Sequence, residues 1–337
     1  KKLLLYLLAS IIVAFSFISV YIFIPESLES FDNRLRDYMF IVRGEEPQSN
    51  QVVIVDIDEK SLSKLGQWPW SRNKVAQMLE NLALAQAAIV GFDIVFAEQD
   101  NSSPHKVLKE LNIQAENIPN YDEIFASVVS QTPTILGYLF EFDDDEYIKK
   151  DEPFPSAIFI ENGREYDENG KALGEDYILN AKGTILNIPI LQDNVYSTGF
   201  FNNTPDPSGI IRSVPLIIRY EGTIYSSLVL EIFRAFSGEK KVFINYGENG
   251  VDNITISDLV IPTDRHGRAI VNFRGKEKTF KYISAVDIYN NDFDVKDIEG
   301  KIILVGTSAA GLLDLRATPF ESVFPGVEVH ANLIDNI

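Results

Sequence analysis

The chain has 337 residues, of which 45% are hydrophobic and 11% aromatic, and this composition supports a folded core and excludes a mainly disordered protein. Its 30 basic and 49 acidic residues give a net charge of −19, which excludes nucleic acid as a partner because such binding depends on Lys and Arg at the phosphates. The absence of cysteine excludes disulfides, a thiolate nucleophile and a cysteine-ligated zinc site.

An apolar segment lies at the start of the chain. Residues 3–24 are 22 consecutive positions without a charge, and as a helix they would span roughly 33 Å, enough for a ~30 Å hydrocarbon layer. A cleaved signal peptide is the alternative, but its apolar core is usually about 7–15 residues long and ends at small residues, which the following FIPES does not offer. We therefore predict a transmembrane helix over residues 3–24.

Two features predict how the rest of the chain sits relative to this span. Lys1 and Lys2 precede it, so the positive-inside rule places the remainder outside the cytoplasm, on the outer side of the inner membrane. In residues 25–44, apolar side chains recur at helical spacing until Gly44 stops the pattern. These residues are predicted to form a membrane-proximal stalk helix, with the apolar positions Leu28, Phe31, Leu35, Tyr38 and Met39.

The next segments predict a strand–helix–strand unit. Residues 51–58 and 87–97 are apolar runs typical of strands buried on both faces. Between them, Ser71 is a suitable N-cap for a helix whose apolar stripe falls at the helical period. A crossover of this kind predicts that the two strands are parallel and adjacent.

The remainder predicts one α/β domain over residues 45–337. Its mixed sheet has a parallel βαβ core, antiparallel additions and helices on the faces, preceded by the transmembrane helix. Residues 142–176 are acidic and rich in turn residues, which predicts an insertion. Residues 195–202 and 210–227 are predicted to pair antiparallel around Glu221 and Gly222. The other expected elements are a helix over 121–129, a strand over 132–141, a helix over 228–236, a strand-rich segment over 242–274, a buried strand starting at 301 and a helix over 326–337.

Small or acidic residues follow the buried strands. If those strands are parallel neighbours, Asp56, Asp58 and Asp93 share one edge of the sheet with Thr307 and Ser308, and ligands of α/β sheets usually bind at that edge. Clustered carboxylates suit a divalent cation, and the glycine turn before Thr307 suits an anion. The alternative is structural, with the aspartates capping helices and holding Arg72 or backbone amides.

The only two tryptophans, Trp68 and Trp70, flank Pro69. We expect a rigid corner before the crossover helix, with Arg72 stacked on one ring or paired to an aspartate; a wall of a ligand site is the alternative. Of the three histidines, His105 and His266 are expected to be solvated, whereas His330 suits packing or hydrogen bonding in the terminal helix.

The candidate residues fall into three overlapping groups. His330 and Asn332 are candidates for signal relay. Asp56, Asp58 and Asp93 are the weaker candidates for a metal site, and no cofactor is required. The candidates for a ligand or sensor pocket are Asp56, Asp58, Trp68, Trp70, Arg72, Asp93, Thr307, Ser308 and Asp314.

Four motifs in this order, VVIVDIDEKSLSKLGQWPWSR, GFDIVFAEQD, GFFNNTPDPSGIIRSVPL and GKIILVGTSAAGLLDLRATPF with the residues that follow it, resemble the type-two CHASE domain. The resemblance covers the chain from about Phe31 and implies an extracytoplasmic sensory domain of a bacterial receptor. Such receptors have one transmembrane helix before the domain and several after it. Their cytoplasmic output is a class III nucleotide cyclase, a histidine kinase, a diguanylate cyclase or another kinase. The resemblance supplies no binding residues.

Three functions remain open from the sequence. The first is a sensory domain, not itself an enzyme, in which a stimulus shifts residues 27–43 relative to residues 327–337 within a homodimer. Its expected partners are the membrane, a second copy and an extracellular ligand or envelope protein. The second is a membrane-anchored, Mg-dependent phosphohydrolase that uses Asp56, Asp58 and Asp93. The third is an envelope scaffold that binds another protein without signalling.

Overall fold

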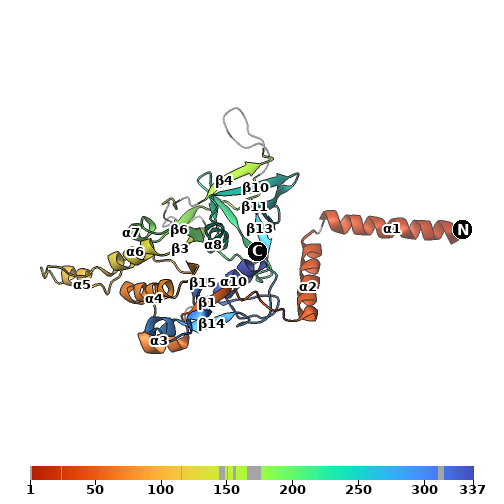
Figure 1. Ribbon diagram of the computed structural model, residues 1–337. Helices are drawn as coiled ribbons and strands as arrows, with labels where there is room; N and C mark the ends of the chain where they lie inside the picture. The colour runs from red at the N-terminus through yellow and green to blue at the C-terminus, as the bar shows by residue number, and fades with distance from the viewer. Residues whose placement is uncertain are drawn as a thin grey trace.

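The structure of the chain is a computed structural model, and it describes residues 2–23, 25–114, 116–143, 149, 151–154, 157–164, 176–309 and 315–337. Asp314 and most of the predicted insertion over 142–176 lie outside the described residues. The described fold is mixed α/β, with a central, largely parallel sheet and a smaller, mostly antiparallel one, as predicted (Figure 1).

Two helices precede the sheets. Helix α1 (Lys2–Phe23) extends away from the folded domain, whereas α2 (Pro25–Arg43) stands against its edge (Figure 1). The helix predicted over residues 25–44 is confirmed, and it ends where Gly44 adopts a left-handed φ of 79°; its place next to a membrane stays a prediction. Among the helices that the structure describes, none is both long enough and apolar enough to cross a bilayer, so the span over residues 3–24 stays a prediction.

The central sheet contains the predicted parallel core. In spatial order its strands are β14 (Lys281–Ser284), β1 (Val52–Asp56), β15 (Ile302–Gly306), β2 (Ile89–Phe92) and β3 (Thr134–Glu141), with β6 (Ser197–Phe200) parallel and β5 (Gly183–Ile185) antiparallel beside β3. The prediction that β1 and β2 are adjacent is wrong, because β15 lies between them and pairs with both. All five residues of β15 are buried, so the strand is most favourably placed at the centre of the sheet. It takes this place although it follows β2 by about two hundred residues in the sequence.

Helices cover both faces of this sheet. Because side chains alternate along a strand, Val53 and Val55 of β1 enter one core, whereas Val52 and Ile54 enter the other. The first core is closed by α3 (Glu59–Leu65), α4 (Arg72–Leu84), α6 (Tyr121–Gln131), α7 (Pro189–Gln192) and α9 (Ala285–Asn290). The second is closed by α8 (Leu228–Ser237) and α10 (Gly326–Asn336). The predicted crossover helix is α4; Ser71 occupies its N-cap position, but the Ser71 side chain makes no capping hydrogen bond.

A second sheet shares the core on the α8–α10 side. Its strands are β12 (Leu259–Pro262), β11 (Gly250–Ile256), β10 (Lys241–Gly247) and β4 (Ile158–Asn162), of which β10, β11 and β12 form an antiparallel meander. This confirms the strand-rich prediction for residues 242–274. Valine and isoleucine side chains of the meander pack with those of α8 and α10.

Short elements connect these layers. The predicted turn at Glu221 and Gly222 is confirmed, because both residues have positive φ and join β8 (Ile217–Tyr220) to β9 (Thr223–Ser226). The prediction that residues 195–202 belong to this antiparallel pair is wrong, since residues 197–200 form β6 in the central sheet. The remaining short elements are α5 (Pro104–Glu110), the 3₁₀ helix η1 (Val295–Asp297) and the strand pairs β7 (Ser213–Pro215) with β13 (Arg268–Ile270) and β16 (Leu315–Arg316) with β17 (Phe324–Pro325).

Candidate functional site

The carboxyl ends of β1, β15 and β2 lie side by side because the three strands are parallel neighbours. Asp56 closes β1 and is buried. Its Oδ1 accepts a hydrogen bond from the Ser308 backbone N–H at 2.9 Å, and its Oδ2 accepts one from Ser308 Oγ at 2.6 Å. Burial raises the pKa of Asp56, and the two bonds from Ser308 oppose this rise. The structure therefore brings Asp56 and Ser308 together as predicted, and their contact holds the loop after β15.

Three further hydrogen bonds hold the same loops. Thr307 Oγ1 donates to the Ile57 carbonyl at 3.2 Å. Asp58 caps α3 by accepting from the Ser61 N–H at 2.8 Å, and its other oxygen accepts from the hydroxyl of Ser284 at the end of β14. Each of these carboxylates thus serves a loop or a helix end. Among the described residues, no group of three or more His, Cys, Asp or Glu side chains is placed to hold a metal ion.

Asp93 follows β2 and meets the terminal helix. Its carboxylate Oδ1 lies 3.6 Å from Nε2 of His330 on α10, and both side chains are buried. Nδ2 of Asn203 lies 3.2 Å from the same His330 nitrogen. Burial raises the pKa of Asp93 to about 7, and the nearby guanidinium of Arg316 limits the rise. The expectation that His330 has a hydrogen-bonding role is confirmed, and the helix is tied to the edge of the sheet at this point.

The tryptophan corner packs as predicted. Trp70 is buried, and its Nε1 donates to the Gly66 carbonyl at 2.7 Å. The rings of Trp68 and Trp70 meet edge to face at 5.3 Å, and the peptide bond before Pro69 is cis. Trp70 belongs to the core on the α4 side, and the partly buried Trp68 packs against that core. The packing interpretation is therefore the one that the contacts favour.

Arg72 connects this corner to the loop after β2. The prediction that it stacks on a tryptophan is wrong: its guanidinium lies 4.6 Å from the ring centre of Phe96, because the loop after β2 brings that ring across the start of α4. The predicted pairing with an aspartate is confirmed, with Arg72 Nε 3.7 Å from Asp122 Oδ1. The Arg72 backbone N–H also donates to Asp100 Oδ2 at 2.7 Å. Arg72 is thus a buried link between α4, α6 and the loop that contains Asp100.

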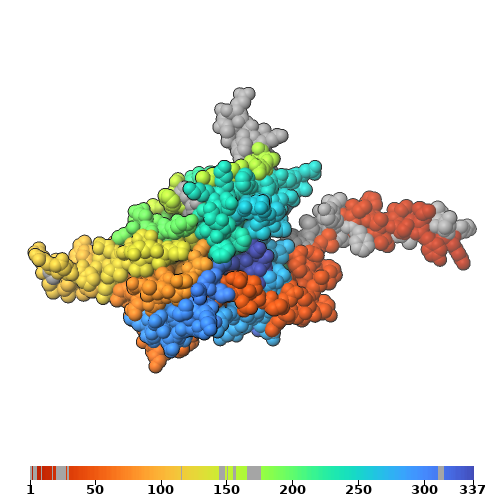
Figure 2. Space-filling model, viewed as in Figure 1, coloured from red at the N-terminus to blue at the C-terminus, as the bar shows by residue number. Residues whose placement is uncertain are grey.

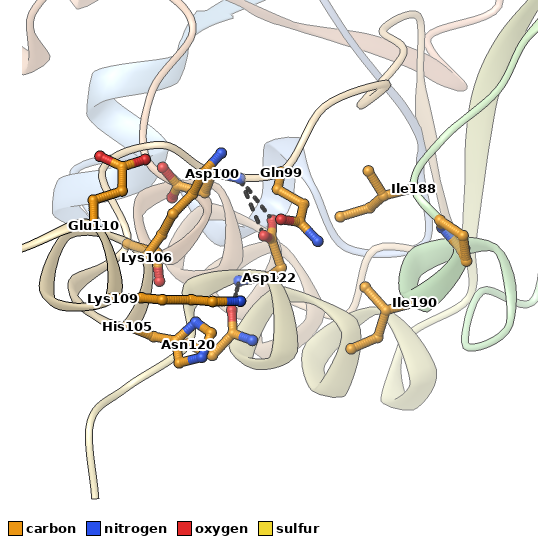
Figure 3. A pocket seen from close by; sticks show the side chains of 12 residues that line it. Gln99, Asp100, His105, Lys106, Lys109, Glu110, Asn120, Asp122, Ile188 and Ile190 are labelled. Carbon is orange, nitrogen blue, oxygen red and sulfur yellow. Dashed lines mark hydrogen bonds between the residues drawn. The ribbon is translucent and has the colours of Figure 1, made fainter. Parts of the chain in front are cut away.

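A hollow of about 650 Å³ opens beside this link, between α5, α6 and α7 (Figure 3). Basic side chains of α5 lie on one side of it, and Ile188 and Ile190 lie on the other. Asp100 and Asp122 line it between these walls, and the Asp100 N–H donates to Asp122. The residues that line it are Gln99, Asp100, Ser103, His105, Lys106, Lys109, Glu110, Asn120, Asp122, Ile188, Pro189 and Ile190.

The sequence reasoning missed most of this hollow. His105 is exposed, as expected for a solvated histidine, but it lies at helical spacing with Lys109, and Lys106 is half-buried beside them. That spacing was a signal for one basic helix face. Ile188 and Ile190 carried no comparable signal, because only the fold brings the start of α7 opposite α5.

The family model of the CHASE2 domain matches residues 9–337. The chain belongs to the CHASE2 domain family. This family consists of extracellular sensory domains, and the match begins upstream of Phe31, where the resemblance in the sequence begins. No curated protein and no solved structure matches the chain.

The CHASE2 domain also joins its stalk helix to its terminal helix, through residues 272–274. On the α2 side, Arg43 donates to Asn272 Oδ1 at 2.5 Å and to the Phe273 carbonyl. On the α10 side, Asn336 exchanges two hydrogen bonds with the Asn272 backbone, at 2.8 and 3.0 Å. We name this set of contacts, with those of Arg274 below, the α2–α10 junction.

Arg274 completes the junction. Its N–H donates to Asn332 Oδ1 at 2.8 Å, and its Nε donates to Asp335 Oδ2 at 2.7 Å. Its Nη1 lies 3.4 Å from Oε2 of Glu46, which follows α2. The relay candidate Asn332 is therefore buried in the junction, two residues along α10 from the contacts of His330 with the sheet edge.

Proposed function

We propose that this CHASE2 domain is the extracytoplasmic sensory part of an inner-membrane receptor, held by residues 3–24, and that it regulates a cytoplasmic nucleotide cyclase or kinase. The observation that carries the proposal is the α2–α10 junction. A stimulus that moves α10 relative to the sheet must also displace residues 272–274 and hence Arg43 of α2, because these groups share direct hydrogen bonds. The stalk helix would carry that displacement toward the membrane.

A continuous set of contacts supports the route by which a stimulus reaches the junction. The hollow is bordered by Asp100 in the loop after β2, and the same loop begins at Asp93, which lies against His330 of α10. Asn332 follows on the same helix and holds Arg274. We propose that a ligand in the hollow shifts this loop, and that α10 carries the shift to the junction.

The lining of the hollow supports a small organic anion with an apolar body as the ligand. Asp100 and Asp122 already accept hydrogen bonds from the backbone and lie beside Arg72. Lys106 and Lys109 supply positive charge for a carboxylate or phosphate group, and Ile188 and Ile190 supply an apolar wall for a short hydrocarbon chain. Carboxylates and phosphates share this anionic chemistry, so a ligand with either group fits the hollow.

Hexanoate and hexyl phosphate are expected to bind the full chain in detergent. Calorimetric titration measures the affinity of each ligand. The double variant Lys106→Gln, Lys109→Gln should bind at least tenfold more weakly, since both cations of the hollow are removed. The matched control Lys64→Gln, Lys296→Gln removes two exposed lysines elsewhere and should bind normally. Equal binding by both double variants, or equal binding of hexylamine, would contradict this ligand class.

The proposed topology is testable because the chain contains no cysteine. A cysteine at the exposed position Lys64 (Lys64→Cys) should react with a membrane-impermeant maleimide in cells whose outer membrane is permeabilised. Lys2→Cys should react only after the inner membrane is lysed. Labelling of Lys2→Cys before lysis, or protection of Lys64→Cys, would rule out the proposed orientation.

A further inference from the structure

Among the described residues, helix α2 docks on its own domain through one face. Asp37 pairs with Arg212 through two hydrogen bonds, of 2.8 and 2.6 Å. One turn later, the Phe40 ring packs against the rings of Phe273 and Phe320, at 6.5 and 6.0 Å. Together with Arg43 at the junction, these contacts fix the orientation of the helix. Its opposite face is therefore held away from the domain.

That opposite face is apolar and exposed. Figure 2 shows α2 at the surface, with its outer side uncovered in this view. Five apolar residues follow one another at alternating steps of three and four, which is the heptad spacing of a coiled-coil seam. Their exposed fractions are 38% for Leu28, 67% for Phe31, 49% for Leu35, 63% for Tyr38 and 66% for Val42. Met39 and Ile41 flank the seam and are exposed to a similar extent.

We propose that this face of α2 pairs with the same face of a second copy of the chain, in a parallel two-helix coiled coil. At roughly 150 Å² for a fully exposed side chain, the low end of the aromatic range because five of the seven residues are not aromatic, the seven residues present roughly 600 Å² of apolar surface. This is about what each partner contributes at the low end of stable interfaces. Because the inner face is docked, the heptad-spaced outer face is the one that α2 offers to such a neighbour.

A membrane surface is a poorer occupant for this face. Helices that lie on lipid have a polar face rich in Lys and Arg, which anionic headgroups attract. Helix α2 carries four acidic and three basic residues in the sequence PESLESFDNRLRDYMFIVR, so it lacks that attraction. The seam also keeps the heptad spacing, which a lipid surface does not require and a second helix does.

The pairing itself is independent of the proposed function, whereas its parallel direction rests on it. If residues 3–24 of both copies lie in one membrane, the two α2 helices must leave it in the same direction. Equivalent residues then face each other, so each residue of the seam contacts the same residue of the second copy. In an antiparallel pair only the central position, Leu35, would do so.

Single-cysteine variants test the proposal in the full chain, in native membranes, under mild oxidation. Disulfide-linked dimers are expected from Leu28→Cys, Phe31→Cys, Leu35→Cys, Tyr38→Cys and Val42→Cys, because seam positions bring Cα atoms within disulfide reach. The controls Ser30→Cys and Asn33→Cys lie on the other side of α2 and should give at least fivefold less dimer. Crosslinking at Leu35→Cys alone would overturn the parallel direction, and equal or absent crosslinking at all seven positions would overturn the interface.

A second measurement guards against crosslinks formed by chance collisions. The double variant Phe31→Glu, Leu35→Glu should shift the purified full chain to monomer in light-scattering mass measurements, because it places two charges in the seam. The matched variant Ser30→Glu, Asn33→Glu adds the same charge to the other side and should stay dimeric. If both double variants stay dimeric, or if both become monomeric, the proposal is contradicted. This outcome does not depend on the results of the topology and ligand experiments.

Discussion

Replacing Asp93 by asparagine is expected to stabilise the protein at pH 8 and to leave its stability nearly unchanged at pH 4. The carboxyl is buried against His330, and its pKa rises to about 7 in the folded chain, from about 3.9 in an unfolded one. Between these values the folded state holds a proton that the unfolded state has released, so rising pH destabilises the fold. Above pH 7 both states are ionised, and the full cost of the buried charge remains.

The difference in the free energy of unfolding between the wild type and Asp93→Asn, obtained from their melting curves, measures this cost. It should grow between pH 4 and pH 7 to on the order of 4 kcal/mol and then stay constant. Thermal unfolding of the full chain in detergent, followed by circular dichroism at several pH values, supplies the curves. Asp258→Asn removes an exposed carboxylate and should run parallel to the wild type at every pH. A constant difference for Asp93→Asn across this range would show that its carboxyl is not held protonated.

Replacing Glu328 by leucine is expected to cost about 3–5 kcal/mol of folding stability. The Glu328 side chain is fully buried at the start of α10. Its carboxylate accepts hydrogen bonds from the N–H groups of Lys278 at 2.9 Å and Thr279 at 3.0 Å, and from Tyr282 Oη at 2.7 Å. Leucine fills the space but leaves these donors buried without an acceptor. The loss falls on the segment that leads into β14.

Glu328→Gln is the matched control, because it keeps one acceptor oxygen at almost the same place. It should cost less than half as much as Glu328→Leu in the same melting experiment. Hydrogen exchange gives a local readout: the amides of residues 278–280 should lose protection in the leucine variant and keep most of it in the glutamine variant. Equal losses in the two variants would mean that the volume of the side chain, and not its acceptors, supports the loop.

Local patterns in the sequence predicted the individual elements well. Helix α4 is amphipathic through Val75, Met78, Leu79 and Leu82, all of which are buried. The strands β1 and β15 are buried at every residue, as their apolar runs predict. Patterns of this kind are local, because a residue's period within its own element determines which face it can bury. The order of the strands is not local, and for this reason the insertion of β15 between β1 and β2 was missed.

The candidate site divides in the same way. Asp56 and Ser308 follow buried strands, so their meeting at one sheet edge could be predicted from two short motifs. The contact of Asp93 with His330 could not, because it depends on how α10 lies across the sheet. The choice of Phe96 over a tryptophan as the partner of Arg72 depends in turn on the course of the loop after β2.

By itself the sequence determined the α/β class, the helix over residues 25–43 and the buried strands, because these follow from composition and periodicity, and the resemblance of its ordered motifs indicated the family. Only the tertiary structure decided the strand order, the hollow beside Arg72, the α2–α10 junction and the uncovered face of α2. Each of these joins residues far apart in the chain. Their proximity results from the packing of two cores on one sheet, and no single segment encodes that packing.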